Sequence, residues 1–345
     1  HHPKGAGAGA EPHTHHGQEL TELDVDRDDF HAFLVRYSRT YSTHDDMEHA
    51  FHTFRRNKQH MAKLNIKQGQ TIYGINEFTD IDPVDFRRMY TGFRPDPSHE
   101  WIRIRRNMPV LDAHVNSIAA NVTSWDWREH GAITPVRNQG ACGACWAISV
   151  CEAAEAAWFL KGHSLPILSP QQLLDCDYLD DSCTGGDPIK AYRYLSQIKG
   201  LELEKSYPFT GVNESTCVYN ASLAVATVSN FTYLTPPCIY NATCPNQDEH
   251  TLAANLVSVG PASICVNTDD GDAWQHYIGG IMTSSTSCEN GYFSLDHCVQ
   301  LVGFNTDPNT GTKYWVVKNS WGGYIYLEFG TNLCGLADEA TFVIP

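Results

Sequence analysis

The residues best suited to chemistry are the two cysteines of the stretch 139–146, QGACGACW. The run that follows, as far as Leu160, is rich in alanine and holds no Gly or Pro, which predicts a buried helix beginning near Cys145. The positive end of a helix dipole favours a thiolate over a thiol, and the thiolate is the nucleophilic form of cysteine. Taken alone, the spacing of Cys142 and Cys145 also fits a redox pair or half of a metal site.

Two further motifs lie far along the chain. Residues 294–299, SLDHCV, place His297 in an apolar stretch, and residues 314–322, YWVVKNSWG, do the same for Asn319. With the cysteine stretch, these motifs resemble the papain family of cysteine proteases, in which the second cysteine of Cys-Gly-Ala-Cys-Trp is the nucleophile. An isolated histidine in an apolar strand is usually a core residue. Three motifs in the family's order make catalysis the stronger interpretation here.

The resemblance implies a catalytic role for each of these residues. His297 would take the proton of the Cys145 thiol and later give it to the leaving amine. Asn319 would orient the imidazole ring, and Trp321 would shield their hydrogen bond from water. The side-chain amide of Gln139 and the backbone N–H of Cys145 would stabilise the oxyanion, by roughly 3 kcal/mol per donor. We expect no cofactor and no metal ion.

The resemblance also implies an α+β fold of the papain type. A helical half and a β-barrel-like half would enclose a cleft, and a helical inhibitory propeptide would precede them. Patterns rich in β-branched and aromatic residues predict strands in the second half, at 261–266, 295–304, 314–319 and 324–329.

We expect four segments along the chain. The first two are a disordered, His-rich tail at 1–25 and an inhibitory propeptide domain at 26–92. A connector at 93–120, with several prolines and a basic run, should be extended and exposed and should hold the activation cleavage region. The peptidase domain would span 121–345, with its helical half at about 121–225 and its β-rich half at about 226–345.

Apolar periodicity supports the propeptide. Between residues 29 and 64 the apolar residues recur at helical spacing, which predicts two helices separated near Ser42 and Thr43, either of which could be an N-cap. Residues 74–80, GINEFTD, resemble the second motif of the family's propeptides. Within the family, this segment is most similar to cathepsin O and then to cathepsin F. Such a propeptide would lie across Cys145 and block it until it is cut off.

The cysteines and the glycosylation acceptors indicate the secretory pathway. The chain has 12 Cys, more than an intracellular enzyme needs, and no apolar targeting segment, so we expect that a signal peptide has been removed. The Asn-x-Ser/Thr acceptors are Asn121, Asn213, Asn220, Asn230 and Asn241.

The resemblance assigns most of the cysteines to disulfides. It implies the pairs Cys142–Cys183 and Cys176–Cys217, and we also expect Cys288–Cys334. The stretch 213–244 reads as a glycosylated surface insertion closed by the pair Cys238–Cys244. We expect Cys151, Cys265 and Cys298 to be buried free thiols, beside the nucleophile Cys145.

Charge and hydropathy limit the partners. A formal net charge of -16 argues against nucleic acid and suits an acidic lysosomal or extracellular compartment. The sequence has no apolar run of 18 residues or more, so we expect no membrane span. The resemblance implies a monomer whose partners are polypeptide substrates, its own propeptide as an intramolecular inhibitor, and inhibitors of the cystatin type.

The resemblance also assigns a pocket for the substrate side chain two residues before the cut. An acid at its floor, Glu339, with Asp187 at its rim, suggests tolerance of Arg or Lys as well as apolar groups. Alternatively, Glu339 turns to solvent and leaves the preference apolar. Gly185 and Gly186 would pair with the extended substrate as an added strand. The predicted substrate-binding residues are Gly185, Gly186, Asp187, Pro188, Cys265, Leu295, Asp296, Cys298, Trp321 and Glu339.

One departure from the family leaves two functions open. After Trp321 and Gly322, a segment of about six residues that usually carries a second aromatic is missing, so His297 would be less well supported. The first function is a cysteine endopeptidase made as a zymogen. The second is a catalytically impaired papain-fold protein that binds peptides or inhibits. A Cys- and His-rich metal protein is the weakest alternative, since the chain lacks further paired ligand spacings.

Overall fold

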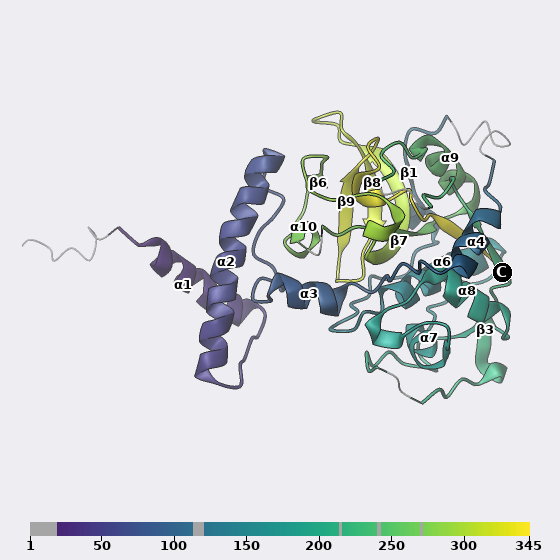
Figure 1. Ribbon diagram of the computed structural model, residues 1–345, viewed down its shortest axis with the longest axis horizontal. Helices are drawn as coiled ribbons and strands as arrows, with labels where there is room; N and C mark the ends of the chain where they lie inside the picture. The colour runs from purple at the N-terminus through teal and green to yellow at the C-terminus, as the bar shows by residue number, and fades with distance from the viewer. Residues whose placement is uncertain (1–18, 113–120, 214–215, 240–242, 270–271) are drawn as a thin grey trace, which may run out of the picture.

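The computed structural model of the chain describes residues 19–112, 121–213, 216–239, 243–269 and 272–345. Figure 1 shows two crossing helices, α1 (Glu22–Arg36) and α2 (His44–Gln68), beside a larger body. Helix α3 (Pro83–Tyr90) leads from this pair to the border between the helical and the sheet-rich parts of the body. The predicted α+β fold with a helical prosegment, the part before the body, is confirmed.

Polar caps set the limits of the first two helices. The side chain of Thr21 accepts from the backbone N–H of Asp24, and the Asp24 carboxylate accepts from that of Thr21, so α1 begins with a capping box. The prediction that the tail is disordered as far as residue 25 is therefore wrong for residues 22–25, while residues 1–18 lie outside the described part. Thr43 caps α2, which confirms the predicted break.

The helical half of the body is built around α6 (Cys145–Leu160). Nearly all of α6 is buried, because its alanines let helices and strands approach it closely from all sides. The other elements of this half are α7 (Pro170–Cys176), η3 (Ser182–Thr184), α8 (Pro188–Ser196), η4 (Ala221–Leu223) and the paired strands β2 (Leu201–Glu202) and β3 (Ala224–Ala226). The single turn η2 (Trp127–His130) packs on the sheet-rich half through the buried Trp127.

Within the described residues, the other half is built on a mixed sheet of eight strands in the order β4-β10-β5-β7-β8-β9-β6, with β1 paired to β7. Strands β5, β7, β8 and β9 confirm the predicted strands. The first strand, β1, comes from the start of the body, so the sheet-rich half also takes residues from the predicted helical half at 121–225. The strands are β1 (Trp125–Asp126), β4 (Asn230–Tyr233), β5 (Ala262–Val266), β6 (Ile281–Met282), β7 (His297–Thr306), β8 (Lys313–Lys318), β9 (Tyr324–Glu328) and β10 (Thr341–Ile344).

Helices and single turns border this sheet. The helical elements of this half are α9 (Glu249–Val259), α10 (Asp272–Gln275), η5 (Tyr292–Ser294) and η6 (Leu333–Gly335). Among the described residues, no helix combines the length and the apolar character that a bilayer span requires.

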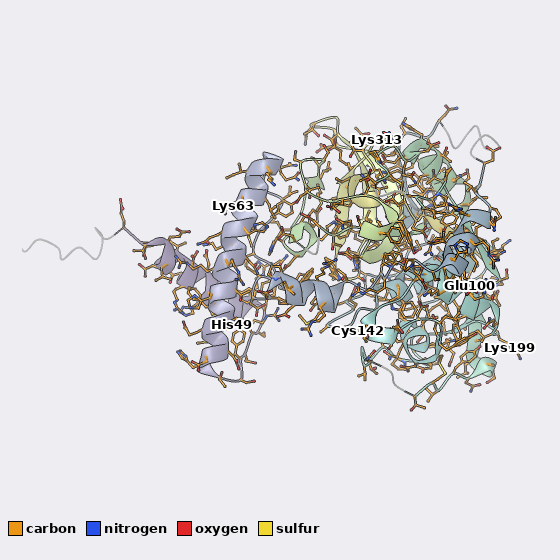
Figure 2. All side chains as sticks on the ribbon, viewed as in Figure 1. His49, Lys63, Glu100, Cys142, Lys199 and Lys313 are labelled. Atoms are coloured by element: carbon orange, nitrogen blue, oxygen red, sulfur yellow. A yellow bond between two sulfur atoms is a disulfide. The ribbon has the colours of Figure 1, made fainter. Side chains whose placement is uncertain are left out.

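The connector differs from its prediction, because it contains helix α4 (His99–Asn107). Figure 2 shows Glu100 of α4 on the side of the body opposite His49 of α2. The prolines of the connector lie outside the helix, so they do not interrupt it. Trp101 and Arg105, four residues apart on one face, are buried against the body. The expected extended, exposed connector is therefore wrong for this stretch.

The stretch 213–244 is also less separate than expected. It contributes β4 to the main sheet, and Phe231 and Tyr233 of that strand are buried. Cys238 and Cys244 are joined as expected but are buried too. The acceptors Asn121, Asn213, Asn220 and Asn230 have exposed side chains and Asn241 lies outside the described part, so glycosylation stays a prediction.

The disulfides include the four expected pairs and one that the sequence analysis missed. The four are Cys142–Cys183, Cys176–Cys217, Cys238–Cys244 and Cys288–Cys334. Cys265 and Cys298 form a fifth pair among the described residues, so the expectation that both are free thiols is wrong. The register of β5 and β7 sets them directly opposite one another, with 4.0 Å between their Cα atoms. Cys145 and Cys151 remain free.

The aromatic core shared by α1 and α2 generates a stability prediction. Phe51 is fully buried against Phe30, so Phe51→Ala should destabilise the prosegment by about 3–5 kcal/mol through the lost contacts and the cavity. Denaturant unfolding of the full chain should then show an early transition that the parent chain lacks. The matched control is Val35→Ala, since Val35 is 82% exposed. A single transition at the parental midpoint would contradict this prediction.

Candidate active site

The thiol of Cys145 lies at the first residue of α6. Ala144 precedes it without any side-chain cap, so the backbone N–H groups of the first turn point toward the thiol end of the helix. The sulfur is fully buried, and the backbone at Cys298 and at Gly92 lies close to it. The nucleophile predicted from the sequence therefore lies beside the strand that begins with His297.

Sheet register brings His297 and Asn319 together. His297 is the first residue of β7 and Asn319 follows the last residue of β8, and these strands are antiparallel. Nε2 of His297 lies 2.8 Å from Oδ1 of Asn319, which also accepts from the backbone N–H of Ser320. Nε2 therefore carries the proton in the neutral ring, and Nδ1 is its basic nitrogen. Nδ1 has no hydrogen-bond partner among the described residues.

Aromatic rings cover this pair. The ring of Trp321 stacks on that of His297 with a centroid distance of 4.6 Å, and Trp274 of α10 meets His297 edge-on at 5.9 Å. The segment after Asn319 is a short turn. It is closed by a hydrogen bond from the backbone N–H of Asn319 to the carbonyl of Gly323. Trp274 thus supplies aromatic support that the shortened segment does not. The sequence carried no signal for this role, because α10 lies far from both motifs along the chain.

Both polar atoms of the Gln139 side-chain amide form hydrogen bonds. Its Nε2 donates to the carbonyl oxygens of Cys142, at 2.9 Å, and of Tyr90 in the prosegment, at 3.1 Å. Its Oε1 accepts from the side chains of Ser320 and Trp321. The donor expected to stabilise an oxyanion is therefore held in place, with a carbonyl of the prosegment on it.

The prosegment crosses the cleft directly over the thiol. Gly186 donates to the carbonyl of Gly92 at 2.8 Å and accepts from the backbone N–H of Arg94 at 3.1 Å, a parallel bridge. The carbonyl of Asp296 on the other wall accepts from Gly92 and Phe93. A Cβ at Gly92 would collide with the carbonyl oxygen of Gly143 and would lie 3.0 Å from the Cys145 sulfur. Only glycine lets the backbone pass this closely.

The predicted substrate pocket holds the side chain of Phe93. That ring packs with Leu295 and the Cys265–Cys298 disulfide, and it meets Tyr292 edge-on at 6.1 Å. The sequence analysis missed Tyr292 and Phe93, since no local pattern distinguishes them from core aromatics. Among the remaining predicted residues, Gly185 adjoins Arg94 of the prosegment, Pro188 starts α8, and Trp321 meets Phe86 of α3 edge-on.

The acidic end of this pocket is also occupied. Glu339 is only 4% exposed and accepts from Tyr233 and from Arg105 of α4, so the alternative that it turns to solvent is wrong in this state. Arg105 also pairs with Asp187, which caps α8 with its other oxygen. Burial raises the pKa of Glu339 to about 7, although the Arg105 guanidinium opposes the shift.

Burial keeps the candidate catalytic pair uncharged in the precursor. It raises the pKa of the Cys145 thiol to about 12, although the N–H of Cys298 opposes this shift. It lowers the pKa of His297 to about 4, opposed by the hydrogen bond to Asn319. Between pH 5 and pH 8, roughly, both groups are therefore neutral, with the proton still on sulfur.

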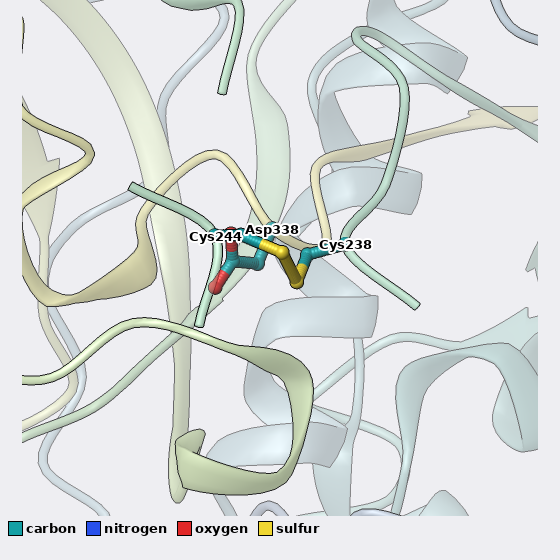
Figure 3. Close-up of side chains that lie close together, drawn as sticks. All are labelled: Cys238, Cys244 and Asp338. Carbon is teal, nitrogen blue, oxygen red and sulfur yellow. A yellow bond between two sulfur atoms is a disulfide. The ribbon is translucent and has the colours of Figure 1, made fainter. Parts of the chain in front are cut away.

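One cluster outside the cleft has the residue types of a metal site. Figure 3 shows Cys238, Cys244 and Asp338 side by side. Their potential ligand atoms all lie within 4.8 Å of one another. The two sulfurs are bonded to each other and so are not available as thiolate ligands. The Asp338 carboxylate accepts from Gly291 and Asn332. The cluster thus has an ordinary structural role, and the expected absence of a metal stays a prediction.

Comparison with known proteins agrees with this geometry. The model of the papain family of cysteine proteases matches residues 121–344, and that of the cathepsin propeptide inhibitor domain matches residues 30–86. The chain therefore belongs to the papain family of cysteine proteases. Its first part is a propeptide of the cathepsin inhibitor type, so the chain is a protease precursor.

Relatives from distant organisms cover most of the chain. It is 34% identical to probable cysteine protease RD19C of Arabidopsis thaliana, over 89% of this chain and 82% of that protein. It is 33% identical to cathepsin F of Mus musculus, over 91% of this chain and 64% of that protein, which confirms the predicted similarity to cathepsin F. The similarity to cathepsin O stays a prediction. The procathepsin L2 structure from Tenebrio molitor has a TM-score of 0.78 at 28% identity, covering 93% of this chain and all of that one.

The close passage of Gly92 predicts that a single methyl group weakens inhibition. Gly92→Ala should push the backbone off Gly143 and Cys145, because the wall it meets is main chain and cannot move aside. We expect the uncleaved precursor to gain at least about 10-fold in hydrolysis of a peptide reporter at neutral pH. Ser98→Ala, an exposed change in the same segment, is the control. Equal activity of both variants would refute the expectation.

The pKa shifts predict when thiolate appears. Because burial disfavours the charged form, a thiol with a pKa near 12 is ionised in roughly one precursor in 10⁵ at pH 7. Removal of the prosegment lets water reach the sulfur, so its pKa should fall and that of His297 should rise. The measurement is thiolate absorbance from pH 5 to pH 8, relative to Cys145→Ala. A full thiolate signal in the uncleaved precursor would contradict this account.

Proposed function

We propose that this chain is the precursor of a cysteine endopeptidase that uses Cys145 and His297 once its prosegment has left. The observation that carries the proposal is a free, buried thiol at a helix N-terminus that packs with Cys298, the residue after His297, whose basic ring nitrogen is unpartnered among the described residues. Asn319 fixes the other nitrogen of that ring. This arrangement suits a nucleophile with an adjacent base that a third group orients.

The steps follow from the atoms that the departing prosegment would expose. Nδ1 of His297 takes the thiol proton, and the sulfur attacks the carbonyl carbon of the substrate. The carbonyl oxygen becomes an anion, stabilised by the Cys145 backbone N–H and by Gln139 Nε2, which has by then lost the Tyr90 carbonyl. The imidazolium then protonates the leaving amine, which leaves an acyl-enzyme thioester. Water, deprotonated by the same imidazole, hydrolyses that thioester and restores the thiol.

Composition and exposure support an acidic compartment of the secretory route, lysosomal or extracellular. The net charge of -16 falls in magnitude as carboxylates take up protons, so self-repulsion falls at acid pH. The exposed glycosylation acceptors and the disulfides fit the same route. We propose polypeptide substrates, inhibition by the chain's own propeptide and by cystatin-type proteins, and a monomeric enzyme.

The alternative function, an impaired binding or inhibitory protein, rests on the shortened turn after Trp321. Two observations weigh against it. Asn319 Oδ1 still lies 2.8 Å from Nε2 of His297, and Trp274 meets that ring edge-on. A reactive thiol would also serve no purpose in a protein that only binds. The alternative becomes the conclusion if the processed chain binds peptides but does not turn them over.

Substitutions at the cleft test the proposal. After removal of the prosegment at acid pH, Cys145→Ala should abolish hydrolysis of a Phe-Arg reporter, since the nucleophile is gone. Gln139→Ala should lower kcat by roughly 10²–10³ with a smaller change in KM, because an oxyanion donor acts mainly in the transition state. Cys151→Ala, at the other free thiol, is the matched control and should keep activity. Labelling of Cys145 by an epoxide thiol trap without any turnover would support the binding protein instead.

A further inference from the structure

Two side chains of the prosegment fill the substrate pocket, and both contact the ring of Tyr292. Phe93 meets Tyr292 edge-on with a centroid distance of 6.1 Å, and the Arg105 guanidinium lies 4.6 Å from the centroid of the same ring. Phe93 belongs to the segment that crosses the cleft, whereas Arg105 belongs to α4. The pocket therefore has an apolar part, which Phe93 occupies, and a charged part, which Arg105 occupies.

The charged part is a buried ion cluster. Arg105 is 1% exposed, and its guanidinium pairs with Asp187 and, at 3.2 Å, with Glu339. Tyr233 donates to both Glu339 oxygens at 3.2 Å. Two carboxylates this deeply buried are costly without a cation, so they favour whichever basic side chain can reach them. In the precursor, that side chain is the chain's own Arg105.

Helix α4 is held by contacts that do not involve the cleft-crossing segment. The cations of Lys190 and Arg193 in α8 lie 5.5 Å and 5.3 Å from the ring centroid of Trp101. Beyond the helix, Leu111 donates to the Tyr233 carbonyl at 2.9 Å, and Asn255 donates to the Leu111 carbonyl at 3.1 Å. A cut between the cleft-crossing segment and α4 would therefore expose Cys145 and leave Arg105 in place.

We propose that Arg105 is a specificity-determining residue, whose presence or removal sets the preference of the pocket. With α4 docked, the pocket takes an apolar side chain where Phe93 lay, and its acids are already neutralised. With α4 removed, Asp187 and Glu339 are free to bind the guanidinium or ammonium group of a substrate Arg or Lys. The enzyme thus passes through two active forms with different substrates. This inference rests on the proposed peptidase function.

The test compares the two forms in the full chain. One precursor carries the recognition sequence of a specific protease between Pro97 and Ser98, and the other carries it between Asp112 and Asn121. After cleavage and acid gel filtration, mass spectrometry verifies which form retains α4. Rates on Arg-Arg and Phe-Arg reporters are then compared. We expect the ratio of Arg-Arg to Phe-Arg hydrolysis to be at least 10-fold higher in the form without α4.

Variants link the effect to one side chain. In the form that retains α4, Arg105→Met should raise the ratio toward that of the other form, whereas Arg103→Met, an exposed change on the same helix, should not. Adding Glu339→Gln to Arg105→Met should remove most of the gain, because one acid is lost. The comparison of the two cleaved forms involves no substitution at Arg105, so it does not depend on the variants folding.

The two proposals fail differently. If both forms hydrolyse the Phe-Arg reporter and have equal ratios of Arg-Arg to Phe-Arg hydrolysis, the role of Arg105 is overturned. The peptidase proposal then remains intact. Loss of Phe-Arg hydrolysis in both forms would overturn the peptidase proposal and, with it, this inference.

Discussion

The precursor depends on one close contact, between the backbone at Gly92 and the cleft wall at Gly143 and Cys145. That contact removes water from the sulfur, and burial raises the pKa of the thiol, which favours its uncharged form. The imidazole of His297 is covered by Trp274 and Trp321, and burial lowers its pKa. The prosegment therefore inhibits chemically as well as sterically. It leaves the thiol in its unreactive form, instead of only standing between the thiol and a substrate.

Much of the prosegment serves to hold that contact in register. Its apolar residues join the core of the sheet-rich half, and two half-buried asparagine side chains hold its loops and tie one of them to the body. Asn65 accepts from the backbone of Tyr73, and Asn76 donates to the carbonyl of Gln275 in the body. Backbone groups that would otherwise be buried without partners are satisfied in this way. The core residues concerned are Ile72, Tyr73, Phe78 and Phe86.

The sequence predicted the elements whose signals are local. The cysteine, histidine and asparagine motifs lie where expected, and the caps and strands followed from short patterns. The features that the sequence did not predict depend on contacts between residues far apart in the chain. The register that pairs Cys265 with Cys298, the packing of Trp274 on His297 and the burial of Arg105 each join segments far apart in the chain. The basic run around Arg105 has the composition of a solvated linker. No local pattern shows that Asp187 and Glu339 pair with Arg105 in the folded chain.

Prolines and glycosylation acceptors explain a second group of wrong predictions, those of extended or surface segments. The connector prolines predict an extended chain, yet a nine-residue helix lies between them. Prolines mark where a helix cannot continue, and they say little about the residues that separate them. The same applies to the stretch 213–244, where sequons suggested a surface insertion, although alternate residues of β4 point inward.

The disulfide between Cys265 and Cys298 imposes a redox window on the enzyme. It lines the pocket and adjoins Cys145, the proposed nucleophile, which would have to stay reduced to react. Too oxidising a medium would convert Cys145 to a sulfenic acid or a mixed disulfide. Too reducing a medium would reduce the Cys265–Cys298 disulfide in the pocket wall to two thiols. The compartment in which this protein matures, and the reductant added when it is handled, must satisfy both conditions at once.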